Sequence, residues 1–99
     1  KHMGHRIELE EIERALEQIP GLERSCCILD TRRNQLAAFY LGEAFPEEIR
    51  REMKRKLPVY MIPHRLFQVS SMPLNKNGKT DRSYFRKLLE EGKACVQKD

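Results

Sequence analysis

The sequence has little of what marks several large classes of protein. It contains three cysteines, an odd number, and two of them, Cys26 and Cys27, are adjacent. They fit neither a disulfide framework nor a zinc-ligand pattern. No apolar run approaches the ~20 residues that a membrane-spanning helix needs, and no secretory signal is visible. The cysteine usage predicts a reducing, cytoplasmic compartment, and no membrane partner is expected.

Aromatic residues are also few, seven in all, and the net charge of +4 comes from 19 basic and 15 acidic residues with interspersed signs. This balance favours an acidic partner or a phosphorylated ligand, but weakly. A nucleic-acid-binding module usually gathers its basic residues on one face and adds stacking aromatics. Such a module, built on Arg32, Arg33 and the Lys54-Arg55-Lys56 cluster, is an alternative function, and nucleic acid is not the expected partner.

Helix and strand signals alternate along the chain. Apolar residues recur at helical spacing over residues 9–19, 46–57 and from about 82 to near Gly92. Strands are predicted over residues 24–29, 35–41 and 66–69, with a five-residue polar loop joining the first two as a hairpin. Pro46 suits the first turn of the second helix, and Asp81 suits the cap of the third. This order predicts one small α+β domain over residues 1–99, with three helices packed on a short, mostly antiparallel sheet and a frayed tail at residues 93–99.

One segment has the composition of a chemically active loop. Asn77-Gly78-Lys79 predicts a tight turn, because asparagine and glycine permit the left-handed backbone that such a turn needs. A lysine held out on this turn can serve as a mobile point charge for phosphate or carboxylate. The alternative is an ordinary solvated lysine, since loop lysines are mostly exposed.

No metal site is predicted. His2 and His5 lie three residues apart, but no cysteine or carboxylate completes a ligand set around them.

Two longer segments carry a family resemblance. The first is GHRIELEEIE at residues 4–13, and the second runs from LPVYMIP at residues 57–63 to LNKNGKTDR at residues 74–82. They resemble core motifs of the adenylate-forming superfamily, which includes peptide-synthetase adenylation domains, acyl-CoA synthetases and luciferases. The first resembles the motif just after the inter-domain hinge, and the second resembles the C-terminal lysine motif. The resemblance covers nearly the whole chain, from about Gly4 to Leu89, and identifies a C-terminal subdomain.

The residues of the lysine motif favour the amino-acid-activating branch. Acyl-CoA synthetases more often show Thr-Gly-Lys-Ile-x-Arg, whereas NGKTDR at residues 77–82 resembles peptide synthetases and D-alanine–carrier-protein ligases. Thr80 departs from the usual isoleucine but keeps its β-branching, so little effect on the loop is expected. An acyl- or aryl-acid ligase for CoA or a carrier protein is the alternative within the superfamily, and a stand-alone accessory piece that docks on a partner chain is a third.

The resemblance implies a two-step reaction. A carboxylate attacks the α-phosphate of ATP, and a carrier-protein phosphopantetheine thiol then takes the acyl group. Lys79 matches the catalytic lysine of the first step, with a supporting set of Asn77, Gly78, Asp81 and Arg82. The loop presented in the second step matches Gly4, His5, Arg6, Ile7 and Glu8. Two partners are implied. One is a large N-terminal subdomain, which provides most of the binding site for ATP, Mg²⁺ and the amino acid, and the other is the carrier protein. By itself, the chain is expected to make no adenylate.

Overall fold

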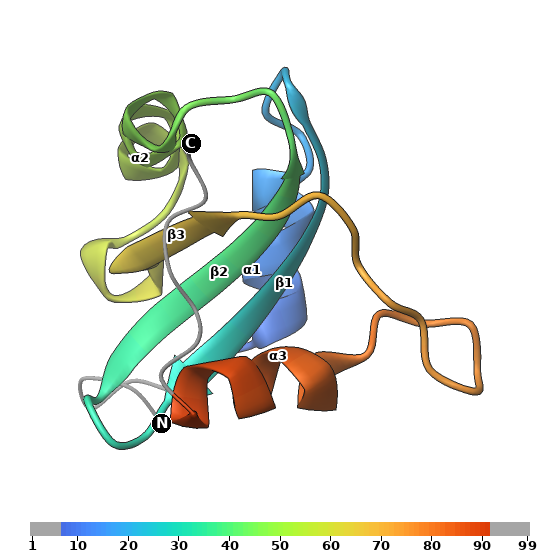
Figure 1. Cartoon of the computed structure of the whole chain (residues 1–99). Helices are drawn as coiled ribbons and strands as arrows, with labels where there is room; N and C mark the ends of the chain where they lie inside the picture. Colours follow the sequence, from blue (N-terminus) through green and yellow to red (C-terminus); the bar gives the residue numbers. More distant parts are fainter. Residues whose placement is uncertain (1–6, 92–99) are drawn as a thin grey trace.

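The fold is a small sheet with helices on both faces (Figure 1). The computed structural model describes residues 7–91. Its elements in chain order are α1 (Leu9–Leu16), β1 (Leu22–Asp30), β2 (Gln35–Gly42), α2 (Pro46–Lys56), the 3₁₀ turn η1 (Val59–Met61), β3 (Arg65–Gln68) and α3 (Arg82–Glu90). The predicted α+β class, with three helices and three strands, is confirmed within this range. The predicted tail at residues 93–99 lies outside the described residues.

The sheet has the strand order β1-β2-β3 and is mixed. β1 and β2 form an antiparallel hairpin, whereas β3 runs parallel to β2. A parallel pair requires a crossover connection, and α2 with η1 supplies it. The hairpin register pairs Asp30 with Gln35. The loop therefore has four residues rather than the predicted five, and Asn34 takes the left-handed backbone at φ 53°.

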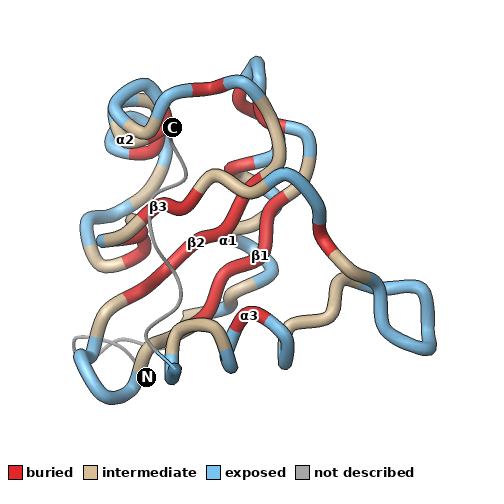
Figure 2. Tube along the Cα trace, viewed as in Figure 1, coloured by how far each residue is buried: buried red, intermediate tan, exposed pale blue. Residues whose placement is uncertain are grey.

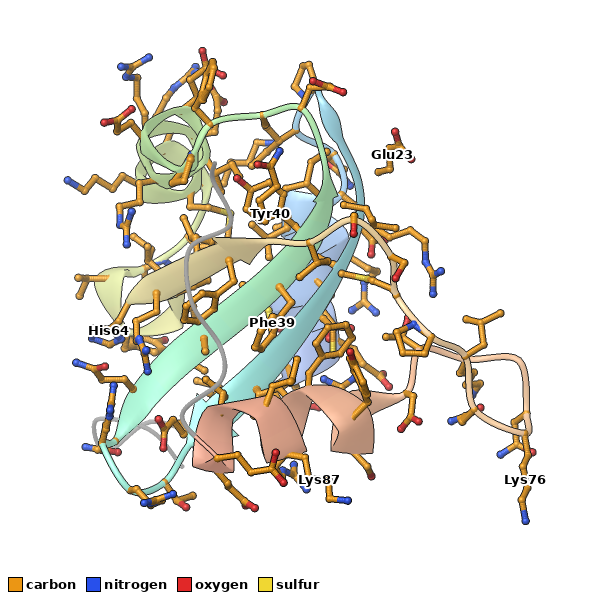
Figure 3. All side chains as sticks on the ribbon, viewed as in Figure 1. Glu23, Phe39, Tyr40, His64, Lys76 and Lys87 are labelled. Atoms are coloured by element: carbon orange, nitrogen blue, oxygen red, sulfur yellow. The ribbon has the colours of Figure 1, made fainter. Side chains whose placement is uncertain are left out.

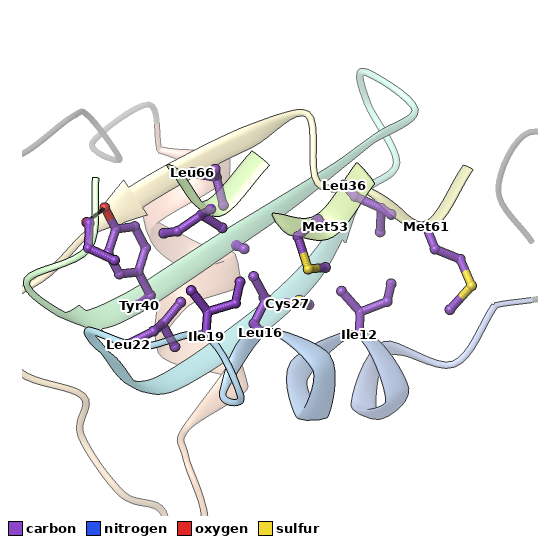
Figure 4. Packing of buried hydrophobic residues seen from close by; sticks show 13 residues of the cluster. Ile12, Leu16, Ile19, Leu22, Cys27, Leu36, Tyr40, Met53, Met61 and Leu66 are labelled. Atoms are coloured by element: carbon purple, nitrogen blue, oxygen red, sulfur yellow. Dashed lines mark hydrogen bonds between the residues drawn. The ribbon is translucent and has the colours of Figure 1, made fainter. Parts of the chain in front are cut away.

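Both faces of the sheet are buried, because α1 and α2 cover one face and α3 covers the other (Figures 1 and 2). Successive strand residues point to opposite faces, so the strands contribute to two apolar clusters. Figure 4 shows the larger cluster, on the α1 and α2 side, which includes Ile12, Leu16, Cys27, Leu36, Tyr40, Ile49, Met53 and Leu66. The smaller cluster, on the α3 side, comprises Cys26, Ile28, Ala37, Phe39, Phe67, Met72 and Phe85.

This arrangement explains the adjacent cysteines. Cys26 and Cys27 point to opposite faces, as the strand period requires, and both are buried because both faces are covered. Burial raises the pKa of the Cys26 thiol to about 11, and it raises the pKa of the Cys27 thiol well above its ordinary value. Both thiols therefore stay protonated and act as packing groups rather than nucleophiles.

The helix termini follow local rules in two cases and depart from the prediction in one. Pro46 lies at the first turn of α2, and the Asp81 carboxylate caps α3 by accepting from the Tyr84 N–H. Helix α1, however, ends at Leu16 rather than near Ile19. A residue preceding proline is disfavoured in the helical region, and Ile19 instead closes a tighter turn through its N–H to the Leu16 carbonyl. Ile19 stays buried in this turn.

Candidate functional site

The segment with the predicted lysine, residues 73–81, projects from the body of the domain between β3 and α3 (Figure 1). We call it the lysine loop. It is a short backbone hairpin: the Asp81 N–H donates to the Pro73 carbonyl over 2.9 Å, and the Asn75 N–H donates to the Lys79 carbonyl over 2.7 Å. These two bonds pair backbone groups within the loop, although most of the loop is exposed (Figure 2). Such internal bonding gives an exposed loop a defined shape.

The tip of the lysine loop is organised by Asn75. Its side-chain Oδ1 accepts from the Asn77 N–H at 2.9 Å and from the Lys79 N–H at 3.1 Å. The Gly78 N–H donates to the Asn75 carbonyl, and Gly78 takes the left-handed backbone at φ 78°, as predicted. Sequence reasoning missed Asn75. The available signal was an asparagine two residues before Asn-Gly, which is the spacing of a side chain that bonds to its own turn.

Lys79 is exposed on this hairpin, and so is Lys76, which extends from the far end of the loop (Figure 3). Lys79 also lines an open hollow of about 630 Å³ between the lysine loop, α1 and the start of β1. Carboxylates of α1 and the guanidinium groups of Arg24 and Arg82 line the same hollow, so its charge is mixed. Lys79 therefore lies on an open surface of mixed charge rather than in an enclosed cavity.

Arg82, at the first position of α3, joins the lysine loop to the body. Its Nη1 donates to Glu13 Oε2 at 2.8 Å and to the Cys27 carbonyl. The same Glu13 oxygen accepts from the Cys27 N–H at 2.7 Å. Burial alone would lower the pKa of the Arg82 guanidinium, but the hydrogen bond and charge of Glu13 outweigh burial and raise it. The two side chains occupy both backbone groups of Cys27 on the free edge of β1.

A second carboxylate, that of Glu17 at the C-cap of α1, makes a similar contact nearby. Glu17 Oε2 accepts from the Ser25 N–H at 2.9 Å and from the Ser25 hydroxyl at 3.2 Å. β1 is an edge strand, and unpaired edge groups are a template for unwanted strand pairing. Glu13 and Glu17 therefore protect this edge. Helical spacing alone would assign both glutamates to a solvated face: Glu17 is indeed exposed, whereas Glu13 is half-buried, and the spacing does not reveal that a strand edge lies beside them.

The hinge-side segment is only partly described. Ile7 is half-buried and packs against the larger cluster, and the Glu8 carbonyl accepts from the Ile12 N–H at the start of α1. Glu8 itself is exposed. The predicted residues Gly4, His5 and Arg6 lie outside the described residues. The two segments that carry the resemblance nevertheless meet, because Glu13 ends the first and Arg82 ends the second.

Several basic residues of the alternative nucleic-acid surface have contacts within the chain. Arg32 donates to the Glu90 carbonyl, Arg33 lies 4.0 Å from the Asp30 carboxylate, and Arg55 pairs with Glu52.

Between residues 7 and 91 the structure holds neither a metal-ligand cluster nor a membrane-spanning helix. In this range no group of three or more histidine, cysteine, aspartate or glutamate side chains could hold a metal ion. No helix in the same range is long and apolar enough to cross a bilayer.

Known proteins resemble the chain in sequence and in structure. No protein-family model matches it. A linear gramicidin synthase of Brevibacillus parabrevis is 45% identical over 86 residues, covering 83% of the chain and 1% of that protein. Tyrocidine synthase 2 of the same organism is 36% identical over 96 residues, covering 92% and 3%. An L-proline–[L-prolyl-carrier protein] ligase of Streptomyces coelicolor is 38% identical over 88 residues, covering 82% and 16%.

Solved structures agree with these sequence relatives. A four-domain nonribosomal peptide synthetase bound to AMP and glycine superposes with a TM-score of 0.76 at 34% identity, covering 86% of the chain and 7% of that chain. The chain matches the C-terminal subdomain of adenylate-forming enzymes. Klebsiella oxytoca NpsA, at 24% identity, has the same fold, with a TM-score of 0.82 over 91% of the chain and 19% of that chain. The subdomain spans at most 16% of the length of the three sequence relatives, so each of them contains far more than this unit.

Proposed function

We propose that the chain is the mobile C-terminal lid of an AMP-forming ligase that activates an amino acid and transfers it to a carrier-protein thiol. One observation carries the proposal: Lys79 is presented, exposed, on a hairpin that is bonded within itself and projects from the body. The three relatives described above support the amino-acid branch, because they are peptide synthetases and a prolyl-carrier-protein ligase.

In the first step, the role of Lys79 is electrostatic. A carboxylate that approaches the α-phosphate of ATP brings two negative groups together, and further charge develops on the phosphoryl oxygens. The Lys79 ammonium group offsets both charges once the lysine loop enters the active site of the larger domain. Losing one such preorganised charge typically costs ~10²–10³ in rate. ATP and Mg²⁺ would be held mainly by that larger domain.

The surface around the lysine loop suits a lid. Leu74 in the loop exposes 54% of its surface, and Tyr84 in the first turn of α3 exposes 46%. Apolar groups beside a functional lysine are expected where a second domain covers the surface intermittently. In the second step we assign the other face to the hinge-side loop: Gly4, His5, Arg6, Ile7 and Glu8. It would line the path of the phosphopantetheine thiol.

An acyl- or aryl-acid ligase is the second candidate. The Brucella canis acyl-CoA synthetase supports it, because that structure superposes with a TM-score of 0.78 at 26% identity over 90% of the chain and 18% of that chain. The two candidates share the lysine loop and differ only in the acid that the larger domain selects.

The test is ATP–pyrophosphate exchange by the full-length enzyme that contains this chain, measured with each amino acid and with acyl and aryl acids. We expect exchange with an amino acid, and a loss of ~10²–10³ in the Lys79→Ala variant. Lys76→Ala is the matched control, because Lys76 is an exposed lysine of the same loop and should have little effect. Exchange that survives Lys79→Ala would make Lys79 an ordinary surface lysine. Exchange with acyl or aryl acids alone would select the second candidate.

A further inference from the structure

Thr80, directly after Lys79, contacts the body of the domain through a bond that the sequence did not suggest. The Arg24 Nη2 on β1 donates to the Thr80 Oγ1 at 2.5 Å. Both residues are partly buried, and 56 positions separate them in the sequence. Isoleucine, the residue expected here from the resemblance, has no atom that could accept this bond. The threonine therefore makes a contact that isoleucine could not make, and its β-branching alone gave no sign of it.

We propose that Arg24 and Thr80 are a positioning pair for Lys79, a role that rests on the function proposed above. Thr80 forms a backbone bridge with Leu74, so the hydroxyl contact holds the base of the hairpin rather than its tip. Arg82 holds the chain two residues later through Glu13. Lys79 thus precedes two anchors to the β1 side of the domain, and its ammonium group moves with the body of the lid.

Of the two anchors, the Arg24 contact is the one that can be removed to test the position of Lys79 without destabilising the fold. Arg82 bonds to the buried Cys27 backbone, so its removal also exposes the edge of β1. Within residues 7–91, the side-chain hydrogen bond of Arg24 goes to a side chain of the lysine loop and not to the backbone of the sheet. Releasing it should leave the sheet intact and loosen only the base of the loop. A hairpin that swings at its base displaces its lysine, and small misplacements of a reacting group lower the rate of the chemical step.

The test uses the full-length enzyme with Thr80→Val, which removes the hydroxyl at nearly constant shape, and Thr80→Ser, which keeps it. We expect Thr80→Val to lower kcat for adenylate formation about threefold to tenfold, with KM for the amino acid unchanged. Thr80→Ser should restore kcat. Arg24→Met should reproduce the loss, and the double variant should be no worse than either single one, because both remove one contact. Thr31→Val is the matched control, since Thr31 is an exposed threonine of the β1–β2 loop.

Two further measurements separate positioning from general damage. Transfer of the aminoacyl group from a chemically prepared adenylate to the carrier thiol should be unchanged in Thr80→Val, because that step does not use Lys79. Hydrogen exchange of the peptide covering residues 73–82 should be faster in Thr80→Val than in Thr80→Ser, with the melting temperature of both near that of the wild type.

The outcomes divide cleanly. A wild-type kcat in Thr80→Val, with or without faster loop exchange, would overturn the positioning role. An equal loss in Thr80→Val, Thr80→Ser and Thr31→Val would also overturn it, since the hydroxyl would then be irrelevant. If the wild-type enzyme forms no adenylate with any acid, the proposed function fails instead. Faster hydrogen exchange confined to Thr80→Val and Arg24→Met would then support the view that Arg24 and Thr80 hold the base of the lysine loop, and unchanged exchange would overturn it.

Discussion

Replacing Glu13 with alanine should destabilise the chain more than any other change to an α1 carboxylate. Glu13 Oε2 is the acceptor for the Cys27 N–H at 2.7 Å and for Arg82 at 2.8 Å. Cys27 is fully buried and its bond to Glu13 is partly buried, so its N–H would lose its partner in a place with little access to water, which costs about 1–3 kcal/mol. The Arg82 guanidinium keeps about a third of its surface in water, so solvent compensates most of its loss.

The two terms together predict a loss of about 1–4 kcal/mol in the free energy of unfolding. For a domain of this size, a loss of about 2.5 kcal/mol, the middle of this range, lowers the melting temperature by roughly 10–20 °C. Urea and thermal unfolding of the 99-residue chain, followed by circular dichroism, measure both quantities. Glu13→Gln should cost about half as much, because the amide oxygen still accepts from Cys27 but carries no charge.

The matched control is Glu11→Ala, the same substitution at an exposed position of the same helix. It should change the free energy of unfolding by less than about 1 kcal/mol, chiefly through the helix dipole. Equal stability of Glu13→Ala and Glu11→Ala would refute the reasoning, because the edge of β1 would then not depend on the carboxylate. A double-mutant cycle with Arg82→Met should show coupling of about 0.5–3 kcal/mol, and simple additivity would mean that the two side chains act independently.

Three further predictions follow from the fold. Gly42→Ala should lower the free energy of unfolding by at least ~3 kcal/mol, because a Cβ there would lie 2.1 Å from the Gly21 carbonyl oxygen. Gly78→Ala, with open space around its Cβ, should lower it by only about 1–2 kcal/mol. Equal losses for the two variants in urea unfolding would contradict this. The pKa of Cys26 is raised to about 11 from an ordinary 9.0, so the folded state favours the protonated thiol. The contribution of this thiol to the free energy of unfolding is complete below pH 9 and falls by about 3 kcal/mol as pH rises to about 11. Cys26→Ala should flatten the decline of stability in that range. In a Cys95→Ser background, the two buried thiols should react with a disulfide reagent at pH 8 only as fast as the domain unfolds, and rapid reaction in the native state would contradict their burial.

Local sequence was sufficient for most of the elements. Pro46 favours the start of α2 because its ring fixes φ, and Asp81 favours the start of α3 because its carboxylate accepts from a backbone N–H of the first turn. Both effects are local, so the neighbouring sequence was enough to predict these two helix starts. The left-handed turn at Gly78 is local for the same reason. The early end of α1 was not predictable from apolar spacing, since Ile19 has the helical period and is buried, but lies in a turn before Pro20.

In the lysine loop, too, some features were predictable from local sequence and others were not. Its lysine and its turn were predicted from the composition and the motif, and the role of Lys79 stays a prediction. Asn75 was within reach of local reasoning, because its bonds span four residues or fewer. The contact between Arg24 and Thr80 was not, since each residue by itself has the pattern of a solvated side chain.

The sequence by itself determined the class of fold, the helix starts, the tight turn at Gly78 and the resemblance to adenylate-forming enzymes, because each depends on residues close together in the chain. Only the tertiary structure decided that β3 lies parallel to β2, that both Cys26 and Cys27 are buried, and that Glu13 and Glu17 cover the edge of β1. These features join residues far apart in sequence. Their partners are selected by which faces and edges the packed helices leave free, and a local pattern does not encode that choice.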